Sequence, residues 1–206
     1  MEGRTPSVYH ARPLMNYTSS VKRCAIALAC VVLVGCNDVL TTTQLDPVQD
    51  DRILGTWVDP NEPDDIGTIE RNGVGYRARS ADTAKDEEPI SFTIARAGQQ
   101  LFVQSEEKCV GHAFAHPNDN RQCYRISRID IRPNELAFSE IDLDYFLKQS
   151  EHGKLAIEHF VARRVDKEGE STTCVLLEGT PAELSAFLAA YPSDGFKSSS
   201  RLRRKN

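Results

Sequence analysis

The clearest pattern in this chain is an alternation of apolar and polar residues with a period of two. In the segment 90–95, isoleucine or phenylalanine at the even positions alternates with serine, threonine or alanine at the odd ones. This period places alternate side chains on opposite faces of a strand, one of which is buried. On similar grounds we predict further strands at 53–58, 68–71, 74–77, 101–103, 109–115, 122–129, 135–139, 155–165 and 172–178.

Two glycine positions mark where predicted strands turn back on themselves. Asn72-Gly73 lies between the strands 68–71 and 74–77. Asn-Gly favours a type I′ hairpin turn because both residues accept a positive φ. Gly98 separates the strand at 90–95 from the one at 101–103. The sequence therefore predicts two hairpins, and with them antiparallel neighbours.

Near the C-terminus the apolar period changes to that of a helix. Thr180 and Glu183 have the spacing of a capping box, and Pro181 stands at the first helical position. An apolar stripe follows at i, i+3, i+4 and i+7. The stripe consists of Leu184, Phe187, Leu188 and Tyr191. We predict a helix that ends at Pro192 and docks on the sheet, and a shorter helix at 142–149.

About eight short antiparallel strands followed by one helix are typical of a small barrel or sandwich. Gly55-Thr56-Trp57, on the first strand, resembles the Gly-x-Trp signature of lipocalins and of shorter lipocalin-like bacterial domains. The resemblance covers 52–196 and implies a mainly β fold, a small antiparallel barrel with one C-terminal α-helix. The chain departs from the family in lacking a Thr-Asp-Tyr motif. Arg163 or Arg164 could be the arginine that caps the tryptophan.

The resemblance also implies a barrel whose interior holds a small apolar ligand. The residues expected to line that cavity are Trp57, Phe92, Ile94, Tyr124 and His159. Two alternatives stay open. An eight-stranded barrel can be filled by its own side chains, and His159 shares an alternating face with Leu155 and Ile157, as a hydrogen-bonded core histidine would.

The N-terminal segment 1–35 has the parts of a secretory signal peptide. Lys22-Arg23 is followed by thirteen uncharged residues, from 24 to 36. A membrane-spanning helix needs about 20, so export with cleavage is the better interpretation. Leu33-Val34-Gly35-Cys36 resembles the lipobox of bacterial lipoprotein precursors, which implies cleavage after Gly35 and diacylglyceryl and acyl groups on Cys36. Met15 is a candidate for the true start.

A lipobox implies a particular division of the remaining chain. We expect a lipidated cysteine and flexible tether at 36–51, the barrel domain at 52–196 and a basic, disordered tail at 197–206. Loss of 1–35 removes four basic residues and one acidic residue, so the formal charge goes from −5 to −8. An acidic body is poorly suited to nucleic acid. We expect the protein to face the periplasm, and Asn37 after the lipidated cysteine favours the outer membrane.

Three further cysteines follow Cys36. Cys109 and Cys123 flank the loop 117–120, and we predict a disulfide between them because disulfides persist outside the cytoplasm. Cys174 lies in an apolar strand and is expected to be buried. Cys109, His112, His116 and Cys123 have the residue types of a zinc site. A disulfide would remove two of these ligands, so no metal is expected.

No motif for a nucleophile, phosphate loop or catalytic metal is present in the sequence. The sequence therefore predicts a lipid-anchored envelope protein that binds a small apolar ligand and is not an enzyme. The alternative is an adaptor or inhibitor that binds another envelope protein through loops such as 117–121. No cofactor is expected beyond the covalent lipid on Cys36.

Overall fold

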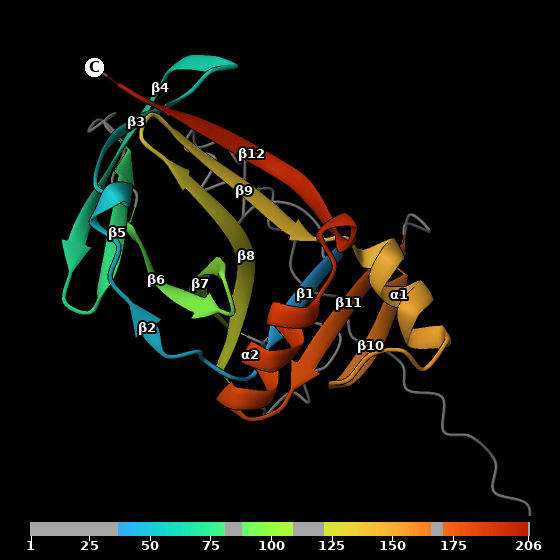
Figure 1. Ribbon diagram of the computed structural model, residues 1–206. Coiled ribbons are helices and arrows are strands. Elements are labelled where there is room, and N and C mark those ends of the chain that lie inside the picture. The colour runs from blue at the N-terminus through green and yellow to red at the C-terminus, as the bar shows by residue number, and fades with distance from the viewer. Residues whose placement is uncertain (1–36, 81–87, 109–121, 166–170, 206) are drawn as a thin grey trace, which may run out of the picture.

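The computed structural model describes residues 37–80, 88–108, 122–165 and 171–205, and these form a mainly β structure with two α-helices (Figure 1). The strands are β1 (Asn37–Thr41), β2 (Pro47–Val48), β3 (Gly55–Asp59), β4 (Glu62–Asn72), β5 (Gly75–Ser80), β6 (Ile90–Ala97), β7 (Gln100–Lys108), β8 (Gln122–Arg132), β9 (Glu135–Ile141), β10 (Glu158–Val165), β11 (Ser171–Glu178) and β12 (Phe196–Arg204). The helices are α1 (Leu143–Glu151) and α2 (Pro181–Ala190), and 3₁₀ turns lie at Asp51–Ile53 and Ser193–Gly195.

Eight of these strands close into an antiparallel barrel. Strands β3 to β9 pair in chain order, and β12 pairs with β9 on one side and β3 on the other. Pairing of β8 with both β7 and β9 completes the ring. The predicted fold class, a small antiparallel barrel with a C-terminal helix, is confirmed.

The last barrel strand lies where the sequence predicted a disordered tail. Strand β12 covers nearly all of 197–206 and pairs with β9 from Phe196 to Arg203. Leu202 is its one fully buried side chain, at 1% exposure. A single apolar position cannot show a period, and the partner strand β3 is far away in the sequence. The prediction for this segment was therefore wrong.

The predicted flexible tether at 36–51 is also wrong over its described residues. Strand β1 pairs in parallel with β11 and antiparallel with β8. Leu40 and Leu45 are buried, and β2 pairs with β6. The polar composition of this segment obscured its few apolar anchors, and a parallel partner leaves no local signature in the sequence.

A second, smaller group of strands extends from the barrel at β8. The first half of β8 pairs with β1, through Tyr124 and Arg125, and its second half pairs with β9 from Arg128 onward. Strands β11 and β10 continue outward from β1, and we call β1, β11 and β10 the side sheet. The predicted strands 155–165 and 172–178 thus belong to the side sheet (Figure 1).

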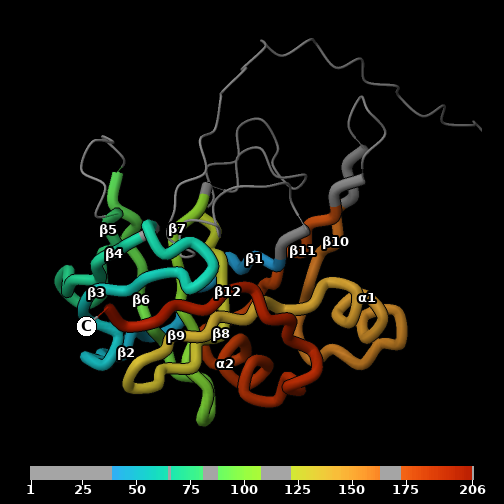
Figure 2. The backbone as a smooth tube through the Cα atoms, turned by 90° about the horizontal axis from the view of Figure 1, so that it is seen from above, coloured from blue at the N-terminus to red at the C-terminus, as the bar shows by residue number. Residues whose placement is uncertain are grey.

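The buried apolar side chains of the two groups of strands form two large hydrophobic cores and one small cluster, which consists of Leu40, Cys123 and Leu176. Strand β7 shows the division, because Leu101 and Val103 point into the barrel whereas Phe102 points outward into the second core. Both helices contribute to this second core, which also contains Ala95 and Ala97 of β6. In Figure 2 the helices lie along the side sheet and the adjoining barrel wall. At the end of β6 the side chains on both faces of the strand are therefore buried, and the expectation of a single buried face does not hold there.

The local signals at turns and caps are largely confirmed. Helix α2 begins with the predicted capping box between Thr180 and Glu183. Gly98 has a φ of 59° at the β6–β7 turn. The β4–β5 turn consists of Gly73 and Val74, one residue later than expected. Only the glycine has positive φ, 61°, which is the pattern of a type II′ turn.

Candidate functional site

A tryptophan–arginine contact joins the first and last strands of the barrel. The Cζ atom of Arg204 lies 4.3 Å from the centroid of the Trp57 ring. The same guanidinium donates hydrogen bonds to the carbonyl oxygens of Pro133 (3.0 Å), Leu54 (3.0 Å) and Arg52 (2.8 Å). The arginine thus binds two separate turns of backbone, the one before β3 and the one between β8 and β9. It also covers the tryptophan, whose Nε1 donates to the carbonyl oxygen of Ile53 at 2.8 Å.

Gly55 is what allows the arginine to reach this position. Its φ is +126°, and a Cβ atom there would lie 2.6 Å from Nη1 of Arg204. The glycine of the Gly-x-Trp sequence therefore serves both the backbone and the approach of the guanidinium. The expectation that Arg163 or Arg164 caps the tryptophan was wrong, because both lie on β10 in the side sheet.

The five residues predicted to line a ligand cavity are distributed over three places. Trp57, Phe92 and Ile94 are buried together in the barrel core, where they are 1%, 4% and 0% exposed. Tyr124 lines a small pocket of about 190 Å³ on the barrel wall, together with Phe92. His159 belongs to β10 and lies outside the barrel.

His159 has the contacts of a structural residue. Its Nε2 lies 2.6 Å from the hydroxyl of Ser150, and its Nδ1 lies 2.9 Å from the carbonyl oxygen of Ile157. The ring meets Phe146 edge-on at a centroid distance of 5.3 Å. These contacts use both ring nitrogens and favour the interpretation as a hydrogen-bonded core histidine.

The cysteine and lipid predictions fall mostly outside the described residues. Gly35, Cys36 and Cys109 lie in segments that the structure does not describe, and so do His112 and His116. The disulfide between Cys109 and Cys123 therefore stays a prediction. Cys123 and Cys174 are both buried, as expected for the latter. Among the described residues, no group of three or more His, Cys, Asp or Glu could hold a metal ion.

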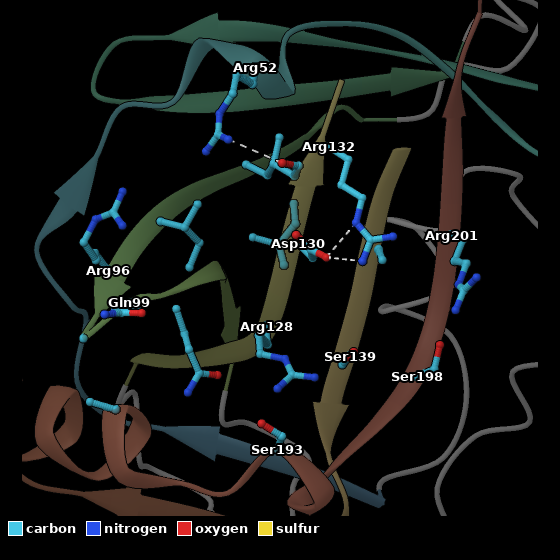
Figure 3. A pocket seen from close by; sticks show the side chains of 17 residues that line it. Arg52, Arg96, Gln99, Arg128, Asp130, Arg132, Ser139, Ser193, Ser198 and Arg201 are labelled. Carbon is cyan, nitrogen blue, oxygen red and sulfur yellow. Dashed lines mark hydrogen bonds and ion pairs between the residues drawn. The ribbon is translucent and has the colours of Figure 1, made fainter. Parts of the chain in front are cut away.

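A polar cleft on the outer wall of the barrel is the most distinctive surface feature. Its volume is about 900 Å³, and strands β8, β9 and β12 form one wall while the β6–β7 turn and the end of α2 form another. Five arginines line it, against one aspartate (Figure 3). We call it the arginine cleft, after Arg52, Arg96, Arg128, Arg132 and Arg201. Ser139, Ser193, Ser198 and Gln99 add neutral hydrogen-bonding groups.

Two of the five arginines already have carboxylate partners. Arg52 binds Asp50, with Nε and Oδ1 2.8 Å apart. Arg132 binds Asp130, with Nη2 and Oδ2 2.7 Å apart, and also contacts Glu135 at 3.3 Å. Figure 3 shows Arg132 joined to Asp130 by dashed lines, with Arg52 above them. Their charge is largely compensated.

The other three arginines form no ion pair with any described residue. Arg96 and Arg201 are exposed and lie on opposite sides of the cleft (Figure 3). Arg128 lies between them, half-buried, with its Cζ 4.3 Å above the ring of Phe196. This stacking fixes one guanidinium in the cleft without neutralising its charge.

Two arginines of the cleft, Arg52 and Arg96, also act on Asp50, the ion-pair partner of Arg52. Hydrogen bonds from Arg52, together with the charges of Arg52 and Arg96, hold the pKa of the Asp50 carboxyl below its ordinary value. A lowered carboxyl pKa indicates an environment that favours negative charge. Arg52 and Arg96 therefore stabilise the negative charge of this carboxylate.

Comparisons with family models, curated proteins and solved structures give no match for this chain. Among the described residues, none of the helices is long and apolar enough to cross a bilayer.

Sequence reasoning missed the arginine cleft because its members come from separate elements. Only Arg128, Asp130 and Arg132 are close in sequence, at alternate positions of β8. This spacing predicts one outward face with charged side chains, which is ordinary for a barrel strand. The gathering of Arg96 and Arg201 on the same face depends on the closure of the barrel by β12.

Proposed function

We propose that the protein is a non-catalytic binding protein of the bacterial envelope that takes an anionic ligand in the arginine cleft. The observation that carries this proposal is the position of Arg96, Arg128 and Arg201 around one cleft, where none of them forms an ion pair with a described residue. The whole chain is acidic, at −5, so a local excess of positive charge is not a consequence of composition. Like charges so placed repel one another, and an anion would relieve this.

The side chains in the cleft suit carboxylate or phosphate groups in particular. A guanidinium offers a planar pair of donors that matches both groups. The volume of about 900 Å³ lies at the upper end of the usual range for small-molecule sites. The opposed positions of Arg96 and Arg201 favour a ligand with more than one anionic group.

Membrane attachment through Cys36 remains part of the proposal. Its support is the lipobox-like sequence Leu33-Val34-Gly35-Cys36 after an uncharged, apolar segment. The diacylglyceryl and acyl groups would hold the protein at the periplasmic face of a membrane, with Asn37 favouring the outer one. A disulfide between Cys109 and Cys123 agrees with that compartment.

Calorimetric titration with citrate and with pyrophosphate would test the cleft. We expect binding that weakens with added salt. Replacement of Arg128 or Arg201 by alanine should weaken it about tenfold each, since hydrogen bonds to charged groups contribute about 1.5–3 kcal/mol. Arg79→Ala is the matched control, because Arg79 pairs with Glu70 away from the cleft. Absence of binding by either probe, or an equal loss in the control, would refute the assignment.

A second candidate function is carriage of a small apolar ligand inside the barrel. It is supported by the apolar interior around Trp57 and Phe92 and by the contact between Trp57 and Arg204, which agrees with the lipocalin-like resemblance. Native mass spectrometry of gently purified protein would detect a retained ligand. The adaptor hypothesis, through loop 117–121, concerns residues outside the described part of the chain.

A further inference from the structure

The first described residue of the chain is already part of the folded sheet. Asn37 opens β1 and pairs with Thr173 of β11. Consecutive Cα atoms are about 3.8 Å apart, so Cys36 lies one such step from a hydrogen-bonded strand. A lipid on Cys36 would thus have no length of spacer chain between it and the folded body.

Two exposed apolar residues lie close to that starting point. The exposed large apolar side chains among the described residues are Val74 (65%), Phe160 (47%) and Val161 (40%). The latter two are on β10, which is the outermost strand of the side sheet. As consecutive residues of the edge strand, they point to opposite faces of the side sheet, one on each side of the same edge.

The register of the side sheet gives their distance from the anchor. Val161 pairs with Val175, which pairs with Val39. Phe160 lies in the next row, which passes through Leu40. The rows of Val161 and Phe160 lie two and three residues beyond Asn37, which is about 7–10 Å along the strand. Across the sheet, β10 lies two strand spacings from β1, which is about 10 Å.

We propose that the β10 edge of the side sheet lies against the same bilayer that holds Cys36, with Phe160 and Val161 in the headgroup–acyl boundary. The inference rests on the proposed lipid anchor. Acyl chains in the membrane keep the start of β1 at the lipid surface, and the absence of a spacer restricts how the body can turn. The two offsets combine to a separation of about 12–14 Å between these residues and the start of β1. At that separation, an edge held beside the anchor can enter the bilayer by the 5–10 Å, roughly, that interfacial apolar groups reach.

The alternative occupant of this edge is a second copy of the chain. Strand β10 is an edge strand, and such strands can pair with another chain. A covalent lipid near this edge favours the bilayer as the occupant, because insertion of the acyl chains brings the edge to the membrane surface. The two occupants give different results in a quenching experiment.

The experiment uses the full, lipidated chain in phospholipid vesicles with brominated acyl chains. Phe160→Trp and Val161→Trp each place a tryptophan on the β10 edge, and Val74→Trp is the matched control. Val74 is exposed but lies at the β4–β5 turn, which Figures 1 and 2 place across the barrel from β10. The native Trp57 is 1% exposed and gives a constant background.

We expect lipid brominated near the headgroup end of its acyl chains to remove about half of the emission of a tryptophan at position 160 or 161, because the proposal places these positions at the headgroup–acyl boundary. The control should lose none. Vesicle flotation separates the two proposals. A chain that does not float refutes both the lipid anchor and the contact of the β10 edge with the bilayer. A chain that floats but whose edge tryptophans are not quenched refutes that contact alone. Blue-shifted, unquenched emission would identify a second copy as the occupant.

Discussion

Arg204 provides the most direct test of how the barrel is held closed. Replacement by methionine keeps much of the apolar stem and removes the guanidinium. The variant loses the contact with Trp57 and the hydrogen bonds to Pro133, Leu54 and Arg52. Three backbone carbonyls and one aromatic face are then left without the partner that joins them.

The expected loss follows from these contacts. A cation–π contact over tryptophan contributes about 1 kcal/mol when it is partly accessible to water. Each hydrogen bond contributes about 1 kcal/mol net, since two of the three are exposed and water can replace the donor. Arg204→Met should therefore lower the free energy of unfolding by about 3–4 kcal/mol, a large part of the 5–15 kcal/mol typical of a domain.

Urea unfolding of the chain from residue 36 onward, with Cys36→Ser to prevent lipidation, would measure this loss. Trp57 is the only tryptophan and is buried, so its emission reports directly on the site. Arg203→Met is the control, because Arg203 is exposed on the same strand. If Arg204→Met and Arg203→Met both change stability by less than about 0.5 kcal/mol, as ordinary surface substitutions do, the reasoning fails. Gly55→Ala should be destabilising by the same route and non-additive with Arg204→Met.

Two further predictions concern β1 and the edge of the cleft. Leu40→Ala should cost about 3 kcal/mol because Leu40 is 0% exposed, whereas a flexible tether would tolerate it; urea unfolding decides between them. Asp50 has a lowered pKa in the folded state, chiefly through hydrogen bonds from Arg52. Its contribution to stability is therefore present above the ordinary carboxyl pKa and is lost as pH falls through the lowered value. Asp50→Asn should flatten the decline of the urea midpoint over that acidic range, and an unchanged decline would contradict the assignment.

The elements that were predicted well are those whose signals are local. The capping box at Thr180 and the glycine turn at Gly98 each lie within a few residues and were found. The segments that were missed depend on distant partners. Strand β12 has one buried apolar side chain, Leu202, and β1 pairs with β11 across most of the chain. Neither relation can be read from a short window of sequence.

The candidate site shows the same limit more strongly. The tryptophan of the Gly-x-Trp sequence was expected to have an arginine partner, but Arg204 could not be chosen because its segment appeared to be an unstructured tail. The arginine cleft needs Arg96, Arg128 and Arg201 on one surface, and only the order of strands β6, β8 and β12 around the ring brings them there.

The place of β12 in the ring has a consequence for how the protein is made. Because β12 pairs with both β3 and β9, the wall between these two strands stays open until β12 has been synthesised. During that time the apolar interior is accessible to other nascent chains, which is the condition that promotes aggregation. The protein should therefore depend on factors that bind the unclosed chain, and removal of β12 alone should leave an aggregating product.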